Sequence, residues 1–350
     1  MNSRIMILFA LLTLIVAPVL FAGGRGEAAP AAEGELPRVE AQLAHSSNPG
    51  GAAGAAAFRD YVMEATDGRF VINTIDYQAL GSVREVTDQI RLGEMEITAV
   101  GTVGLAHVWP DLQMVNLPFL FPNRDVFWDL MLDDEYVGYI RDNIMAASRN
   151  TIRYLGAAEN SVRHLYTNQQ IRVPDDLQRH NIKIRVQESP IMQAVWTGLG
   201  AGEIVAMSGS ERDAAIQAGT LDAIEGSFGG AWAGGNLSVL GNSTLTGHVY
   251  DYMHYFVNAE FYNSLPAEYQ RVVDEAVTVA IDAHNNAAFE SEQVSIVEAR
   301  DAGVWVYEPD ASEVRQWQDR AIPAGERFIQ GQVSETFINL TYESIERIAQ

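Results

Sequence analysis

Two arginines within strand-like segments are the residues of this sequence whose type and spacing best suit chemistry. Arg163 lies in VRHLYTN (162–168) and Arg185 lies in IKIRV (182–186), two segments rich in β-branched residues. A guanidinium presents a planar fork of N–H donors that matches the two oxygens of a carboxylate more directionally than lysine could. A single arginine in a strand is usually a solvated surface residue. Two in successive strands indicate a candidate site for an organic anion.

The charge balance of the whole sequence makes this pair of cations stand out. The sequence has 46 acidic and 23 basic residues, a formal net charge of −23 at pH 7. Such a charge repels nucleic acids and anionic membrane surfaces at long range, so we expect neither as a partner. A small anionic ligand would need a local cluster of positive charge, which Arg163 and Arg185 can supply.

Motifs typical of enzymes are absent from the sequence. There is no G-x-S-x-G nucleophile elbow, no H-x-x-x-H pair on a helix, no P-loop, and no G-x-G-x-x-G between a strand and a helix. The sequence also contains no cysteine, which excludes disulfides, thiolate metal sites and thiol nucleophiles. We therefore expect neither a hydrolase nor a dehydrogenase, and we predict no catalytic residues, no metal and no cofactor.

The N-terminal segment has the layout of a secretory signal. Arg4 precedes an apolar run from Ile5 to Ala22, and small residues follow. We predict a signal peptide at 1–22, cleaved after Ala22 or Gly24, and a periplasmic mature protein. The length of the run leaves an uncleaved membrane anchor as the alternative. Residues 23–37, rich in Gly, Ala, Glu and Pro, are predicted to form a disordered linker.

From residue 38 onward, strand and helix patterns alternate, which predicts an α/β fold with an open sheet covered by helices. Residues 266–303 have no proline after Pro266 and no glycine before Gly303, which predicts one helix of about 35 residues and about 50 Å. The β-α-β arrangement occurs twice, which suggests two lobes facing one cleft. Strands are expected at 38–45, 69–76, 96–101, 151–157, 162–168, 182–186, 220–226 and 304–309, and shorter helices at 51–68, 84–94, 189–200 and 211–219.

An ordered set of motifs resembles the solute-binding proteins of tripartite ATP-independent periplasmic (TRAP) transporters, of the dicarboxylate-binding-protein type. The set covers nearly all of the mature chain and consists of EATDGRFVINTI, ALGSVRE, RLGEMEIT, LPFLF, RHLYTNQQIRVPDDLQRHNIKIRV, ERDAAIQAGTLDAIEG, TGHVY and the long helix. The resemblance implies a two-lobed, type II periplasmic-binding-protein-like fold that closes on an organic acid anion and delivers it to the TRAP permease subunits in the membrane. We expect a monomer.

The resemblance also implies how the chain is divided into hinged, discontinuous lobes. Lobe I is expected to comprise 38–158 plus about 250–285, and lobe II 159–249 plus about 286–350, with the long helix running along both. The crossing strands near 157–163 and 247–256 would absorb the bend when the lobes close.

The same resemblance assigns roles to individual residues. It implies that Arg185 forms a bidentate salt bridge with the ligand carboxylate and that Arg163 assists, from two strands that run side by side. Ligands in open α/β sheets lie outside the carboxyl ends of the strands. By that rule, His45 and Ser46 after the first strand and Thr102 after the third are expected to face the cleft.

The sequence departs from the family pattern at two positions. Gly209 stands where many members have an aromatic residue that stacks on the ligand, and Gly226 where many have an asparagine. Both glycines are expected at an enlarged binding site, because they remove side chains or let the backbone approach the ligand. This favours a bulky monocarboxylate, such as a sugar acid or an aromatic acid, over a C4-dicarboxylate.

Two alternatives stay open. Residues 208–226 also resemble the branch that binds 2-oxo acids, in which a metal ion bridges the ligand and a glutamate at the place of Glu225. An oxygen ligand of this kind suits a hard cation. Glu225 could instead hydrogen-bond the end of a strand or the hinge. The other alternative is a sensor protein that presents its closed form to a membrane receptor rather than to a permease.

Overall fold

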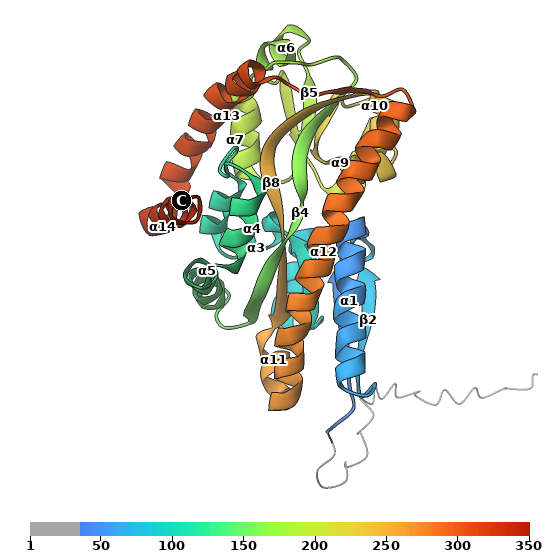
Figure 1. Cartoon of the computed structure of the whole chain (residues 1–350), viewed down its shortest axis with the longest axis vertical. Coiled ribbons are helices and arrows are strands. Elements are labelled where there is room, and N and C mark those ends of the chain that lie inside the picture. The colour runs from blue at the N-terminus through green and yellow to red at the C-terminus, as the bar shows by residue number, and fades with distance from the viewer. Residues whose placement is uncertain (1–35) are drawn as a thin grey trace, which may run out of the picture. The chain divides into compact units, whose positions relative to one another are not determined.

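Alternating apolar strands and amphipathic helices build one mixed sheet with helices packed against it (Figure 1). The computed structural model describes residues 36–350, of which Arg38–Gln350 form one compact unit. The predicted signal peptide, and the predicted linker except for its last two residues, lie outside the described residues. Among the helices of residues 36–350, none is both long enough and apolar enough to cross a membrane.

The elements follow the predicted alternation, and the structure adds strand β6, a longer β8 and several further helices. The strands are β1 (Val39–His45), β2 (Phe70–Asp76), β3 (Ile97–Gly101), β4 (Ile152–Thr167), β5 (Lys183–Val186), β6 (Glu203–Ala206), β7 (Ala223–Ser227), β8 (Asn242–Asn258) and β9 (Trp305–Tyr307). The helices are α1 (Pro49–Ala65), α2 (Val83–Leu92), α3 (Thr102–Ala106), α4 (Arg124–Leu132), α5 (Asp134–Ala147), α6 (Pro174–Arg179), α7 (Pro190–Leu199), α8 (Gly209–Gln217), α9 (Phe228–Ala233), α10 (Asn236–Leu240), α11 (Ala259–Ser264), α12 (Ala267–Asp301), α13 (Ala311–Gln332) and α14 (Glu335–Ile348), with 3-10 turns η1 (Tyr77–Ala79) and η2 (Pro110–Asn116).

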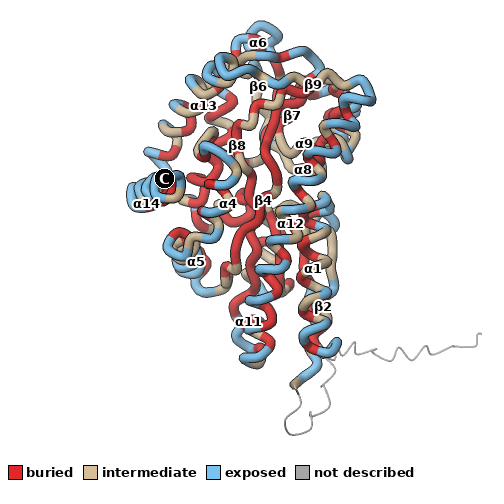
Figure 2. The backbone as a smooth tube through the Cα atoms, in the orientation of Figure 1, coloured by how far each residue is buried: buried red, intermediate tan, exposed pale blue. Residues whose placement is uncertain are grey.

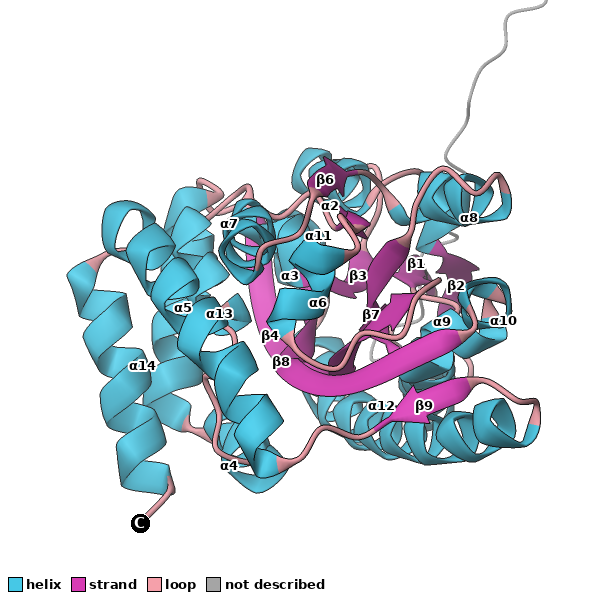
Figure 3. Ribbon diagram, turned by 90° about the horizontal axis from the view of Figure 1, so that it is seen from above, coloured by secondary structure: helices cyan, strands magenta, loops and turns pink. Residues whose placement is uncertain are grey.

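Two groups of parallel strands are joined by one long antiparallel pair. The described strands lie in the order β2-β1-β3-β8-β4-β7-β5-β6, with β9 added beside β8. Strands β1, β2 and β3 form the N-terminal strand group, and β5, β6 and β7 form the C-terminal strand group. Between them, β4 and β8 pair with each other along most of their length, and Figure 3 shows how strongly this pair curves.

The sheet order corrects two of our sequence predictions. The segments 151–157 and 162–168 belong to one strand, β4, because bulges near Gly156 and Ser161 let it bend without ending. The strands of the two arginines do not run side by side, because β7 lies between β4 and β5 and pairs with both. Strands that are close in sequence need not be neighbours in a sheet when helical crossovers connect them.

The long helix is confirmed. Helix α12 has 35 residues, and its termini lie within two residues of the predicted bounds. It contacts α1 near the N-terminal strand group, β4 along the middle, and α9 and β9 near the C-terminal strand group (Figure 1). One continuous helix therefore spans both strand groups.

The apolar core follows the central strands β3, β4, β5, β7 and β8, which are buried along most of their length (Figure 2). One large cluster extends from the N-terminal strand group through the β4–β8 pair to α7 and α13, and it includes Trp196 and Trp317. A separate cluster around Tyr166 and Phe228 supports β7 and α9. Both clusters hold the strand ends in place, and those ends carry the candidate site.

Candidate functional site

A cleft lies at the carboxyl ends of the parallel strands, where open α/β sheets place their ligands. It consists of two adjoining cavities of about 150 and 490 Å³. Residues from both strand groups and from β4 line it. Eight residues line both cavities: Ser46, Asn48, Tyr77, Gln78, Asn160, Arg185, Gln187 and Arg212.

Arg185 is a buried cation in this cleft. It lies on β5, is 3% exposed, and its Nε and Nη2 atoms donate to the backbone carbonyl of Met207 at 3.0 and 2.6 Å. Burial, helped by the nearby Arg212 charge, lowers the pKa of Arg185 to about 10, so the guanidinium stays charged at neutral pH. No carboxylate among residues 36–350 forms an ion pair with it. A buried charge without a counter-ion is costly, so this arginine is suited to pair with an anionic ligand.

Arg163 is equally buried but fully paired. From β4, its Nε and Nη2 atoms donate to the two carboxylate oxygens of Glu225, both at 2.7 Å, and its Nη1 atom donates to Asp251 at 2.9 Å. Burial opposes the charge of Arg163, but Glu225 and Asp251 outweigh it and raise the pKa of the guanidinium. Burial likewise opposes the charge of Glu225, yet Arg163 and His248 hold the pKa of that carboxyl far below its usual value. The guanidinium fork of Arg163 is therefore occupied by protein carboxylates.

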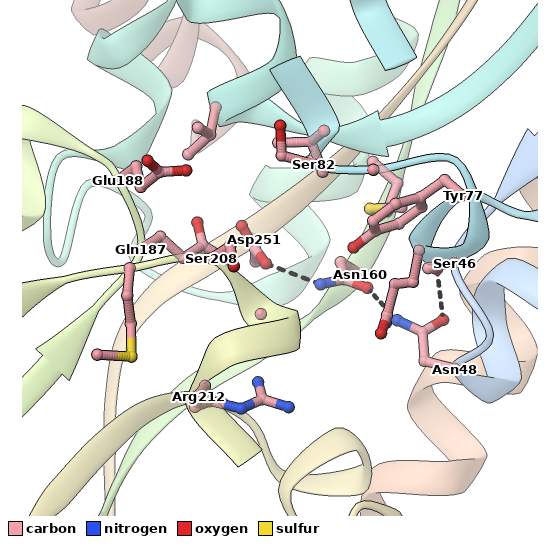
Figure 4. Close-up of a pocket in the computed structure, with 18 of the residues that line it drawn as sticks. Ser46, Asn48, Tyr77, Ser82, Asn160, Gln187, Glu188, Ser208, Arg212 and Asp251 are labelled. Carbon is pink, nitrogen blue, oxygen red and sulfur yellow. Dashed lines mark hydrogen bonds between the residues drawn. The ribbon is translucent and has the colours of Figure 1, made fainter. Parts of the chain in front are cut away.

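A chain of hydrogen bonds connects this ion pair to the N-terminal strand group (Figure 4). The Ser46 hydroxyl donates to Asn48 Oδ1 at 3.0 Å, and Asn48 Nδ2 donates to Asn160 Oδ1 at 2.6 Å. Asn160 Nδ2 in turn donates to Asp251 Oδ2 at 2.8 Å, the same oxygen that accepts from Arg163. Polar groups from the β1–α1 loop, β4 and β8 thus meet at the cleft.

Most of the residues that we predicted for the site line the cleft. Ser46 and Arg185 line both cavities, Gly209 lines the smaller one, and Arg163, Glu225 and Gly226 line the larger one. Apart from its chain neighbours and its own helix, a Cβ atom added at Gly209 would meet no described heavy atom within 4 Å, and one added at Gly226 would meet Arg163 Nη2 at 3.9 Å. Both glycines border open space.

Two predicted residues lie outside both cavities. The Thr102 side chain is buried, and its hydroxyl bonds to His254 Nε2 at 3.1 Å, while its neighbours Gly101 and Val103 line the cleft. His45 is half-buried and bonds through Nδ1 to the backbone carbonyl of Ser46 at 2.7 Å. The strand-end rule located the correct loops, but it could not decide which side chain in each loop turns toward the cleft.

Several lining residues were not predicted from the sequence. Asn48 caps α1 just before Pro49, a signal typical of a helix N-terminus, and Tyr77 and Gln78 follow the end of β2. The helix cap at Asn48 and the end of β2 before Tyr77 place these residues after strand ends, where the cleft was expected. Asn160 gave no such signal, because its position depends on a bulge in β4 that forms only against β8.

A sheet with two parallel strand groups, a cleft at their carboxyl ends and a buried cation with no counter-ion among residues 36–350 are features expected of a solute-binding protein. Comparison with known families agrees: the model of the family described as DctP, bacterial extracellular solute-binding protein, family 7, matches residues 41–332. The chain belongs to this family, the solute-binding proteins of TRAP transporters, as the sequence motifs implied. The prediction of a transport protein rather than an enzyme is confirmed, and the family is periplasmic.

Two relatives align with most of this chain. A solute-binding protein of Verminephrobacter eiseniae is 27% identical over 77% of this chain and 78% of its own length. The C4-dicarboxylate-binding periplasmic protein DctP of Rhodobacter capsulatus is 24% identical over 81% of this chain and 84% of its own.

A solved structure of the same fold is the sugar acid binding protein DctPAm of Advenella mimigardefordensis in complex with galactonate. It superposes with a TM-score of 0.83, covers 89% of this chain and 99% of its own, and is 21% identical in sequence. The predicted two-lobed α/β fold is thereby confirmed.

Proposed function

We propose that this chain binds a bulky hydroxylated monocarboxylate, such as a sugar acid, in the cleft and delivers it to the membrane subunits of a TRAP permease. The observation that carries this proposal is Arg185, a buried guanidinium with no ion-pair partner among residues 36–350. A ligand carboxylate would supply the missing counter-charge and accept from the fork in a bidentate pair.

The neutral lining of the cleft supports a hydroxylated ligand. Six uncharged hydrogen-bonding side chains line both cavities: Ser46, Asn48, Tyr77, Gln78, Asn160 and Gln187. Amides both donate and accept, as hydroxyl groups do, so they can satisfy a polyhydroxylated chain along its length. The structurally similar protein with bound galactonate shows that this fold accommodates such a molecule. The combined size of the two cavities favours a ligand larger than a C4 acid.

A second ligand carboxylate would find no free arginine. The other two arginines that line the described cleft are both ion-paired, Arg163 with Glu225 and Asp251, and Arg212 with Asp213 at 2.7 Å. A dicarboxylate would have to displace a protein carboxylate from one of them. This disfavours the C4-dicarboxylate alternative, although a relative carries that ligand in its name.

The arrangement around Glu225 does not favour a metal-bridged 2-oxo acid. Both of its oxygens accept hydrogen bonds from Arg163, and Oε2 lies 3.3 Å from His248 Nε2. Within residues 36–350 there is no group of three or more His, Cys, Asp or Glu side chains that could hold a metal ion. A cation at Glu225 would compete with a guanidinium that already occupies both oxygens.

The transport cycle we propose is a hinge closure. Lobe I (38–158 plus about 250–285) and lobe II (159–249 plus about 286–350) would close on a ligand that Arg185 holds in lobe II, because contacts to lobe I form only on closure. Helix α12 and the β4–β8 pair connect the lobes and would bend. A signal peptide at 1–22 would direct the protein to the periplasm, and residues 23–37 would serve as a linker.

The test is a ligand screen on protein lacking residues 1–22, after refolding to remove any retained ligand. Thermal shifts are measured with sugar acids, aromatic acids, 2-oxo acids and dicarboxylates, each with and without calcium. A ligand at 100 times its dissociation constant adds about 2.7 kcal/mol of stability. We expect a metal-independent shift with a sugar acid.

Arg185→Ala is the matched variant for this screen. It should bind at least about 100-fold more weakly, because the ligand carboxylate would be buried without a partner. Arg271→Ala, an exposed position on α12, serves as the control and should bind like the parent protein. Tight binding by Arg185→Ala, or no shift with any acid, would refute the proposal.

A further inference from the structure

We propose that Glu188 determines specificity in this cleft: its carboxylate accepts hydrogen bonds from ligand hydroxyl groups and repels a second ligand carboxylate. This inference rests on the proposed function, because it concerns the far end of a ligand whose carboxylate is held by Arg185.

Glu188 differs from the other acidic residues that line the cleft, each of which is ion-paired with an arginine. Asp213 is paired with Arg212, and Glu225 and Asp251 are paired with Arg163. The Glu188 side chain, in contrast, forms no hydrogen bond or ion pair with any residue in the range 36–350. It is partly buried, it lines the smaller cavity, and Figure 4 shows its carboxylate oxygens turned toward that cavity.

The backbone around Glu188 is held on both sides, so its side chain is presented in a defined place. Arg84 Nη2 donates to the Glu188 backbone carbonyl at 2.8 Å. Arg84 lies in the first turn of α2, where Ser82 and Glu85 form a capping box that fixes the start of the helix. Directly after Glu188, Ser189 is buried and Pro190 begins α7. The cation of Arg84 is thus bound to the backbone of Glu188 and leaves the carboxylate unpaired.

Among the described residues that line the smaller cavity, one cation and one anion therefore have no ion-pair partner within residues 36–350: Arg185 and Glu188. A monocarboxylate with hydroxyl groups satisfies both, because its carboxylate accepts from Arg185 and its hydroxyl groups donate to Glu188. An ionised carboxylate is only an acceptor, so a second ligand carboxylate could not hydrogen-bond to Glu188. It would also face a like charge in a partly desolvated cavity, where repulsion is stronger than in water. The cleft should consequently discriminate against dicarboxylates of the same length.

The experiment compares ligand pairs that differ only at one end: galactonate with galactarate, and gluconate with glucarate. In each pair, a terminal CH2OH group is replaced by a carboxylate. Dissociation constants are measured by calorimetry for the parent protein, Glu188→Gln and Glu290→Gln. The last variant removes the same charge from an exposed position on α12 and is the control.

We expect the parent protein to bind at least one aldonate ten-fold or more tightly than its aldarate partner. Glu188→Gln should reduce that ratio at least ten-fold, mainly by gaining affinity for the aldarate, since the amide can donate to it. Glu290→Gln should keep the parent ratio.

The outcomes separate this inference from the proposed function. A parent protein that prefers the aldarate, or a ratio unchanged in Glu188→Gln while binding still depends on Arg185, would overturn the role of Glu188 and leave the proposed function intact. Binding of no sugar acid, or binding that is insensitive to Arg185→Ala, would overturn the proposed function and this inference with it.

Discussion

At the scale of single residues, the two arginines of the cleft show that residue type and burial do not determine a role. Arg163 and Arg185 are both 3% exposed and both lie on strands that contribute to the cleft. Arg163 has two protein carboxylates as partners, whereas the partner of Arg185 within residues 36–350 is a backbone carbonyl. The first therefore stabilises the fold around the site, and the second is available to an anion.

This difference predicts opposite effects of alanine substitution on stability. Arg163→Ala should lower the free energy of unfolding by about 3 kcal/mol or more, because Glu225 and Asp251 would be left buried without a cation. Arg185→Ala should leave the free energy of unfolding near that of the parent protein or raise it, because it removes a buried charge without a counter-ion. Urea unfolding of the ligand-free proteins measures both, and the reverse order of stability would contradict the assignment.

At the scale of elements, the close contact between α1 and α12 positions the cleft, because α1 begins directly after the loop of Ser46 and Asn48. The contact depends on small residues. A Cβ atom added at Gly54 would lie 2.2 Å from the Tyr255 hydroxyl and 3.1 Å from the backbone carbonyl of Ala280. The sequence predicted both helices but carried no indication that they pack closely at Gly54.

Gly54→Ala should therefore destabilise the protein, although alanine is the better helix former. We expect a loss of about 1–3 kcal/mol from overpacking. Gly138→Ala on α5 is the matched control, because a Cβ atom there has no heavy atom within 4 Å, and it should be neutral or stabilising by up to about 1 kcal/mol. Thermal or urea unfolding compares the two. Equal effects of both substitutions on the free energy of unfolding would contradict the prediction, because they would show that α1 and α12 can move apart to accommodate the added methyl group.

At the scale of the whole molecule, stability depends on pH through groups that the fold keeps uncharged. His254 is completely buried between Thr102 and Tyr154, which bond to its two ring nitrogens. Burial lowers the pKa of His254 to about 3. Histidine in the unfolded chain has a pKa of about 6.5, so between that pH and the folded pKa the unfolded chain binds a proton while His254 in the folded protein stays neutral.

Stability should therefore fall as the pH drops below about 6.5, by up to about 1.4 kcal/mol per pH unit from this residue until the pH approaches the folded pKa. His254→Gln should flatten the decline by that amount between pH 6 and pH 4.5. His180→Gln, at an exposed position, should keep the full decline. Comparing each variant with the parent protein at the same pH cancels the change in net charge. A decline in His254→Gln as steep as in the parent would contradict this origin.

Local signals in the sequence were sufficient to predict the helices and strands, but not which strands are neighbours in the sheet. Strand ends, glycine stops and the proline-free run at 267–301 depend on residues close together in the chain, so the elements and their alternation could be predicted. The position of β7 between β4 and β5 depends on crossovers and on packing against α9, and no short segment of sequence encodes it.

The sequence by itself determined the family, the α/β class and the long helix, because these follow from local patterns and ordered motifs. It also indicated Arg185 as the candidate partner of a ligand carboxylate, which stays a prediction. Only the tertiary structure decided which charges are free. Arg163 is neutralised by carboxylates 62 and 88 residues away in the chain. The carboxylate of Glu188 has no partner within residues 36–350, because Arg84, 104 residues away, binds its backbone instead. Charge pairing acts over a few ångströms in space, and the order of strands in the sheet sets those distances.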